Sequence, residues 1–303
     1  MPTTAATLTR ANFGELLTPV HRKVFFESYT EKPEQYSQIF KVDTMDRKEQ
    51  TYPHMGAFGL WQQNTEGSAF NQSAIAQGNK ATFTARRFDN SYTLTWELMQ
   101  DDVNSVMRGA GVGGSARSLG RSLRATVEDD AVKVLTGGFA NTGYDGVPLF
   151  SANHPLINST AKGDNLVTGP LNDANLKTAL TKLRNQVDEA NVRIAANADT
   201  LFVSPDWEFT ARALIGSMNQ AGGSLNDINV LPNLNIVVLD FLGSSKIWGV
   251  QDSAFDNLMF LWRERAWFDS ERLERSMDYN MFGYARWDCG YVDWRGIVAS
   301  IGA

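Results

Sequence analysis

Cysteine is nearly absent from this sequence, because Cys289 is the only one in 303 residues. A single cysteine excludes an intrachain disulfide framework, and it suits a reducing cytosol or a particle that is stabilised without thiol chemistry. Histidine is also scarce, and His21, His54 and His154 are too dispersed to form a helical metal pair. The sequence therefore predicts no disulfide and no metal site.

Long apolar runs and blocks of like charge are missing too. No hydrophobic stretch approaches the roughly 20 residues that span a bilayer, and residues 1–10 lack the basic and then apolar pattern of a signal peptide. The formal net charge of -6 is opposite in sign to that of a mainly electrostatic nucleic-acid binder. These absences predict a protein that is made in the cytoplasm and has no membrane partner.

Residues 1–45 have the composition of an extended arm with one short helix. The helix is predicted from apolar residues at helical spacing, namely Phe13, Leu16, Leu17 and Val20. Further aromatic residues follow without a regular period, among them Phe25, Phe26, Tyr29, Tyr36 and Phe40. An arm with this many large apolar groups must be covered, either by the chain's own core or by a neighbouring subunit. The pattern leaves both arrangements open.

Residues 46–96 read as a long and largely polar β-hairpin. One strand is expected over residues 52–61, and the other over residues 81–96, where β-prone residues alternate. The segment between them, residues 62–80, has the Asn-, Gln-, Ser- and Gly-rich composition of a loop. Because an isolated hairpin is marginally stable in water, the sequence predicts that a partner supports this one.

Residues 97–108 and the residues from Ser115 to Gly137 read as two helices that flank a glycine-rich segment. The second helix has an apolar stripe at four-residue spacing, made by Leu119, Leu123, Val127, Ala131 and Leu135. The glycines match a dinucleotide-binding fingerprint, Gly109-x-Gly111-x-x-Gly114, but that fingerprint needs a preceding strand. Since a helical segment precedes them, we expect no cofactor and predict a hinge at Gly109, Gly111, Gly113 and Gly114.

Residues 140–255 alternate helical and strand patterns after an irregular start, which predicts a compact α/β-type subdomain. Asn172 or Asp173 is expected to cap one helix, and Ser204-Pro205-Asp206 to open another. Short strands are expected over residues 200–203, 236–241 and 246–250. The remaining chain is β-like and aromatic, with five of the eight tryptophans after residue 245.

Ser151 and Cys289 are the candidate catalytic nucleophiles, but neither lies in a sequence motif that would activate it. Ser151 is close in sequence to His154, but no strand-to-helix elbow surrounds the serine, and His154 is expected to be a loop residue. Cys289 lies in a strand-like segment typical of a buried, inert thiol. We therefore predict no catalytic residue and no enzyme. A soluble oligomeric enzyme is the alternative, and it would need a deep polar pocket with convergent acids.

The segment Asp145-Gly146-Val147-Pro148-Leu149-Phe150-Ser151-Ala152-Asn153-His154-Pro155 carries a family resemblance. It lies after the long helix and before the helix near residue 173, and it resembles a segment of Mu-like phage major head subunits. The order of arm, polar hairpin, long helix, α/β block and aromatic β tail resembles the same family over most of the chain.

This resemblance implies an α+β protein with the Hong-Kong-97-type capsid fold. In that fold residues 1–45 would be the N-terminal arm and residues 46–96 the E-loop hairpin. Residues 97–139 and 256–303 would form the peripheral domain with its spine helix, and residues 140–255 the axial domain.

The resemblance further implies a virion protein that self-assembles in the host bacterial cytoplasm into the hexamers and pentamers of an icosahedral head. The expected partners are other copies of the chain, a portal protein, a scaffolding protein and an optional decoration protein, with double-stranded DNA enclosed but not bound specifically. Contacts between subunits are expected at Phe25, Phe26, Tyr29, Phe58, Trp61 and Phe70, although Phe58 and Trp61 could instead fold back onto their own sheet. The glycine hinge would let the spine bend as a precursor shell expands. An encapsulin-like compartment shell and another virion subunit are the alternative interpretations.

Overall fold

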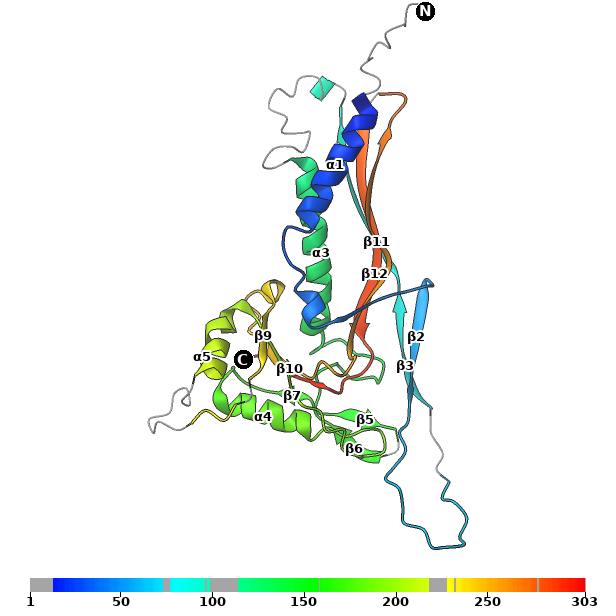
Figure 1. The fold of residues 1–303 in the computed structure, drawn as a ribbon, viewed down its shortest axis with the longest axis vertical. Helices are drawn as coiled ribbons and strands as arrows, with labels where there is room; N and C mark the ends of the chain where they lie inside the picture. Colours follow the sequence, from blue (N-terminus) through cyan, green and yellow to red (C-terminus); the bar gives the residue numbers. More distant parts are fainter. Residues whose placement is uncertain are drawn as a thin grey trace, which may run out of the picture. The chain divides into compact units, whose positions relative to one another are not determined.

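The computed structural model describes residues 13–72, 77–95, 97–98, 114–157, 159–217, 228–231, 233–276 and 278–302. The chain forms two compact units, and each unit is built from segments that are far apart in the sequence (Figure 1). Unit 1 consists of residues 1–33, 85–127 and 262–287. Unit 2 consists of residues 34–84, 128–261 and 288–303.

Unit 1 combines helices with long antiparallel strands. Its elements are α1 (Phe13–Tyr29), the first half of α3 (Ser115–Gly137), β4 (Arg86–Leu94) and most of β11 (Leu258–Arg272) and β12 (Tyr279–Tyr291). β4 pairs with β12 in a register that runs from Leu94↔Tyr279 to Arg86↔Trp287. These strands belong to a four-stranded sheet in the order β1-β11-β12-β4, where β1 is Lys41–Thr44. The bounds of α3 confirm the helix predicted over residues 115–137.

Helix α1 is longer than the short helix expected from the sequence, and it continues to Tyr29 despite Pro19. Phe25 explains the extension, because its ring is fully buried and stacks on Phe268 with 5.1 Å between ring centroids. Burial of this kind stabilises a helix more than intrinsic propensity does. α1 lies beside α3 in Figure 1, and a methyl group at Gly120 of α3 would come within 2.4 Å of the Phe25 carbonyl oxygen. A glycine is therefore needed where the two helices meet.

Unit 2 is built around a five-stranded mixed sheet in the order β7-β13-β10-β8-β9. Its strands are β7 (Leu166–Val167), β13 (Ile297–Ser300), β10 (Trp248–Gln251), β8 (Thr200–Val203) and β9 (Asn235–Val238). β10 is antiparallel to β13 and β8, whereas β8 and β9, like β13 and β7, are parallel. β8 confirms the strand predicted over residues 200–203. The strand predicted over residues 236–241 ends early, because a 3-10 turn, η4 (Asp240–Leu242), replaces its last part.

Two helices complete the core of unit 2. α4 (Asp173–Arg184) begins as predicted after Asn172, whose side-chain oxygen accepts a hydrogen bond of 2.8 Å from the Asn175 N–H. α5 (Glu208–Gly216) follows η3 (Pro205–Trp207), the 3-10 turn that begins after Ser204. Leu176, Leu183 and Leu214 of these helices are buried in one cluster with Trp248 and Val298 of the sheet.

Part of the predicted arm lies on the core of its own chain. η2 (Tyr36–Gln38) follows α1, and the buried Tyr36 ring lies 4.5 Å from the ring of Phe260, centroid to centroid. The Glu128 carboxylate accepts hydrogen bonds from the backbone N–H groups of Gln35 at 2.9 Å and Tyr36 at 3.0 Å. For this part of the arm, the structure selects the chain's own core from the two arrangements that the sequence left open.

The polar hairpin consists of β2 (Glu49–Met55) and β3 (Gln77–Thr84), which pair antiparallel. Two predicted features of the hairpin are wrong. The strand expected to run to Trp61 ends at Met55, and the strand expected over residues 81–96 divides at Ala85. After Ala85 the chain leaves the hairpin, and β4 pairs with β12 instead, which buries Leu94 in the core of unit 1. Residues 56–72, which we call the hairpin loop, have no regular secondary structure beyond one turn.

Candidate functional site

The family-like segment from Asp145 to Pro155 forms a tight turn followed by the strand β5 (His154–Leu156), which pairs with β6 (Ser159–Gly163). The Gly143 N–H donates to the Val147 carbonyl at 2.8 Å, and Gly146 adopts a φ of 84°. Only glycine adopts such a φ readily, since it lacks the Cβ atom that causes strain there. Gly146 therefore allows the chain to form a turn at this point of the segment.

His154 is a buried residue of β5, which corrects the prediction that it is a loop residue. Its Nδ1 lies 2.6 Å from Asp145 Oδ2, and its Nε2 lies 3.1 Å from the Leu149 carbonyl oxygen and 3.2 Å from Asn165 Oδ1. The imidazole also stacks on the Trp294 ring, with 4.4 Å between centroids and 5° between planes. Both ring nitrogens lie within hydrogen-bonding distance of oxygen atoms, so contacts on two sides fix the orientation of the imidazole.

Asn165 completes this cluster and was not predicted from the sequence. Its Nδ2 donates to the carbonyl oxygens of Leu149 at 2.7 Å and Trp294 at 3.1 Å, while its Oδ1 accepts from the Ser151 N–H at 2.8 Å. Asn165 is fully buried, so these bonds satisfy polar groups that water does not reach. Nothing in the local sequence distinguishes this asparagine from the many others in the same stretch.

A second buried polar group adjoins the first through Trp294. Arg295 donates to Glu189 Oε1 at 2.8 Å, to Asp293 Oδ1 at 3.0 Å and to the Val187 carbonyl at 2.8 Å. Its guanidinium also lies over the Trp294 ring, 4.6 Å from the centroid. Burial alone would lower the pKa of Arg295, but the adjacent carboxylates of Asp293 and Glu189 raise that pKa above its ordinary value. The arginine is therefore held as a cation inside unit 2.

These contacts describe a structural cluster, which we call the motif cluster: Asp145, His154, Asn165, Trp294, Arg295 and Glu189. The nitrogens of His154 are occupied by acceptors other than Ser151, whose Oγ accepts from the Asn153 N–H at 3.2 Å. Cys289 is half-buried, with its Sγ 3.3 Å from the Asp130 carbonyl oxygen. In the part of the chain that the structure describes, no group of three or more His, Cys, Asp or Glu residues could hold a metal ion. The described helices include none that is long and apolar enough to span a bilayer.

The two remaining histidines also have structural contacts. In unit 2, His54 Nε2 lies 2.6 Å from the Val292 carbonyl oxygen, and its ring stacks on Tyr144. In unit 1, His21 is fully buried and its Nδ1 lies 2.8 Å from the Tyr92 hydroxyl oxygen. Its Nε2 is buried without a hydrogen-bond partner. Burial lowers the pKa of His21 below its ordinary value of 6.5.

We expect His21 to make unit 1 less stable in acid. A group whose pKa is lowered by folding takes up protons preferentially in the unfolded chain, so its contribution to stability is complete above pH 6.5 and declines as the pH falls below it. His21→Gln should reduce this pH dependence, and urea unfolding at pH 7.5 and at pH 5.5 of both proteins measures the difference. An equal loss of stability in acid for the two proteins would contradict the assignment to His21.

The hairpin loop exposes the three hairpin residues that the sequence singled out. Phe58 is 59%, Trp61 98% and Phe70 96% exposed, so none of them folds back onto its own sheet. Leu60 is exposed as well, at 78%, and was missed because the alternation expected from a strand does not apply to this loop. These four apolar side chains line a groove of about 560 Å³ within the loop, together with Gln62, Asn64, Asn71 and Gln72.

The three arm residues have different surroundings from those of the hairpin loop. Phe25 is fully buried in unit 1, so it has no surface with which to contact a neighbouring chain. Phe26 and Tyr29 are half-buried, and the Arg124 guanidinium lies 4.1 Å from the centroid of the Tyr29 ring. Of the predicted hinge glycines, Gly114 is buried directly before α3. Gly109, Gly111 and Gly113 lie outside the described residues, as does most of the helix expected over residues 97–108.

Comparison with known proteins agrees with this architecture. A family model described as "Phage capsid protein" matches residues 79–300. No curated protein sequence matches the chain. Three solved structures are similar in fold at low sequence identity: the capsid of cyanophage P-SCSP1u, the mature capsid of bacteriophage PhiM1 and a virus-like particle from Pyrococcus furiosus.

The TM-scores of these three structures are 0.58, 0.56 and 0.53, and their identities are 12%, 10% and 10%. The alignments cover 90%, 86% and 93% of this chain, and 89%, 84% and 98% of the other chains. At such identities the likeness establishes only the fold, which is the α+β Hong-Kong-97-type capsid fold predicted from the sequence. The family is established by the match of the family model to residues 79–300. The chain therefore belongs to the phage capsid protein family and is the major capsid protein of a tailed phage.

Proposed function

We propose that the hairpin loop supplies a principal contact between subunits as the chain assembles into hexamers and pentamers of an icosahedral head. The observation that carries this proposal is the exposure of Trp61 at 98% and Phe70 at 96%. An apolar cluster of this kind on a soluble chain marks an interaction surface. The polar side chains that line the groove of the loop are neutral amides, which add hydrogen bonds at the rim of an interface without a charge to desolvate.

The proposal extends to the domains and to the partners of the chain. The hairpin of β2 and β3 would be the E-loop, although it ends at Thr84 and not near residue 96. Residues 1–45 would serve as the arm, residues 97–139 and 256–303 as the peripheral domain, and residues 140–255 as the axial domain. A Mu-like head with a portal, a separate scaffolding protein and an optional decoration protein is the arrangement that the motif favours. Such a head would be assembled in the host cytoplasm and would enclose double-stranded DNA.

Removal of the two most exposed aromatic side chains should prevent shell formation. Trp61→Ser combined with Phe70→Ser removes most of the apolar surface of the hairpin loop, while an exposed side chain contributes little to the stability of its own chain. We therefore expect the free energy of unfolding to change by less than about 0.5 kcal/mol. Electron microscopy of the full chain, expressed alone and with its scaffolding protein, should show closed shells for the wild type and small soluble species for the variant.

A matched control is Phe209→Ser, because Phe209 of α5 is also an exposed aromatic residue, at 81%, outside the hairpin. Shells of normal size from the double variant would contradict the role of the hairpin loop. Double-stranded DNA in particles purified from infected cells would distinguish a phage head from an encapsulin-like compartment that holds protein cargo.

A further inference from the structure

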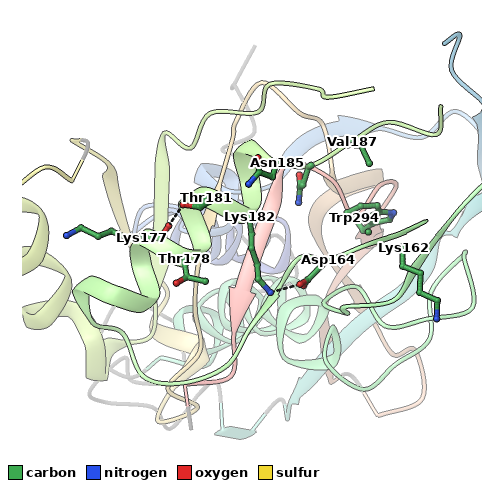
Figure 2. Close-up of a pocket in the computed structure, with 11 residues that line it drawn as sticks. Lys162, Asp164, Lys177, Thr178, Thr181, Lys182, Asn185, Val187 and Trp294 are labelled. Atoms are coloured by element: carbon green, nitrogen blue, oxygen red, sulfur yellow. Dashed lines mark hydrogen bonds and ion pairs between the residues drawn. The ribbon is translucent and has the colours of Figure 1, made fainter. Parts of the chain in front are cut away.

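A groove of about 450 Å³ opens on unit 2 beside α4 and collects basic side chains (Figure 2). Lys177 and Lys182 of α4 line it, as do Lys162 of β6 and Asp164 just after that strand. Figure 2 shows the Lys182–Asp164 pair between Lys177 on one side and Lys162 on the other. The floor includes Trp294, which is only 1% exposed, so the groove offers no open apolar pocket at that residue.

Two of the cations around this groove have a carboxylate partner. Lys177 Nζ lies 2.8 Å from Asp173 Oδ2, and Lys182 Nζ lies 2.5 Å from Asp164 Oδ2. Each of these lysines is at least 30% exposed, and surface ion pairs of this kind are weak enough to exchange with another anion.

Two other cations are oriented by neutral amides instead. The exposed Lys162 Nζ lies 3.4 Å from Asn153 Oδ1, and the exposed Arg193 donates to Asn185 Oδ1 at 2.8 Å. Asn185 itself lines the groove, so Arg193 stands at its rim. An amide oxygen fixes the direction of a cationic side chain but leaves its charge uncompensated.

The groove therefore has an excess of positive charge on a chain whose formal net charge is -6. Its four cations are opposed by Asp164 and Asp173. Asp188 lies nearby, but its Oδ1 accepts from the N–H groups of Ala190 and Val192 within its own loop. Even with Asp188 included, cations exceed carboxylates among these described residues.

We propose that this groove, which we call the α4 groove, binds the phosphate backbone of double-stranded DNA and marks the side of unit 2 that faces the interior of the head. This inference rests on the proposed function, because it assumes an assembled head with DNA inside. Lys and Arg contact phosphates without reading the sequence, as packaged DNA of any sequence requires. An acidic peptide is a poorer fit, since tight peptide docking relies on an apolar anchor in a pocket and Trp294 is covered.

The test uses a fluorescein-labelled DNA duplex and the unassembled full chain, with fluorescence anisotropy measured over a range of salt concentrations. Lys162→Gln combined with Arg193→Gln removes two charges, keeps an amide donor at each position and leaves no carboxylate without a partner. We expect weaker binding and a plot of log affinity against log salt concentration whose slope is shallower by about 2, one unit for each lost phosphate contact. Lys162→Arg combined with Arg193→Lys retains both charges and should retain the wild-type slope.

A matched control is Arg22→Gln combined with Arg275→Gln, which removes two exposed cations from unit 1. An equal change of slope in this control would show that only total charge matters and would overturn the proposal, as would an unchanged slope in the α4-groove variant. The same variant can also be titrated with polyglutamate. If the groove substitutions weaken the binding of polyglutamate more than the binding of DNA, the groove would be assigned to an acidic protein instead. Electron microscopy of the same variants shows whether they form shells. Shell formation tests the proposed function independently of DNA binding.

Discussion

Replacing His154 by phenylalanine is expected to lower the free energy of unfolding by about 3 to 5 kcal/mol. The phenylalanine ring can retain the stacking on Trp294, but it is larger than the imidazole, so part of the loss comes from overpacking at this fully buried position. The larger part comes from lost polar contacts: the partner of the Asp145 carboxylate, whose side chain is only 5% exposed and lies 2.6 Å from His154 Nδ1, and the Nε2 contacts to Leu149 and Asn165. A buried carboxylate without a partner retains its desolvation cost and loses the compensating interaction.

The double variant His154→Phe with Asp145→Asn tests this explanation directly. The amide carries no charge, so the double variant should be more stable than His154→Phe alone, and a double-mutant cycle gives the coupling between the two residues. Equilibrium urea unfolding at neutral pH provides the four free energies. A purely additive cycle would contradict the ion pair, although the buried hydrogen bonds of Asn165 would remain.

Arg295→Met should have an effect of similar size, about 3 to 5 kcal/mol, because it leaves the Glu189 carboxylate buried and unpaired. The side chains of Arg295 and Glu189 are only 5% and 9% exposed. Methionine fills much of the space of the arginine stem, so most of the loss comes from the guanidinium group, which also donates to Asp293 and to the Val187 carbonyl. Adding Glu189→Gln to this variant should restore part of the lost stability, because the amide carries no charge. The Ile157 N–H donates to Glu189 Oε2 at 2.8 Å, and the amide oxygen of glutamine can accept the same hydrogen bond.

A surface ion pair provides the control for this second prediction. Lys23 and Glu27 lie 3.8 Å apart on α1, with side chains 77% and 60% exposed. Lys23→Met should change the free energy of unfolding by no more than about 0.5 kcal/mol, because water solvates the remaining carboxylate. Comparable losses from Lys23→Met and Arg295→Met, measured by the same urea titration, would show that burial does not decide the effect.

The features predicted correctly from the sequence depend on local patterns. The apolar stripe through Leu119, Val127 and Leu135 set the bounds of α3, and the capping oxygen of Asn172 marked the start of α4. In both cases the residues that determine the structure lie within a few positions of the element itself. Trp61 and Phe70, predicted from the sequence as subunit contacts, are exposed, although Trp61 lies in a loop and not at the end of the predicted strand; the contacts themselves stay a prediction.

The features that were missed depend on partners far away along the chain. The division of the second hairpin strand at Ala85 follows from pairing with β12, nearly 200 positions later, and propensity gives no sign of it. Asn165 bonds the Trp294 carbonyl, and Glu189 pairs with Arg295, over separations of 129 and 106 residues. A single sequence does not show that these residues meet, so the motif cluster was recognised only as a family-like segment without a physical role.

The position of β13 in the sheet of unit 2 has a consequence for synthesis. Ile297–Ser300 is the last described strand of the chain, yet it lies inside the sheet, where it bridges β7 and β10. Because β7 and β10 are synthesised before β13, the sheet of unit 2 can close only after residues 297–300 have left the ribosome, and until then β7 and β10 each have an unpaired edge.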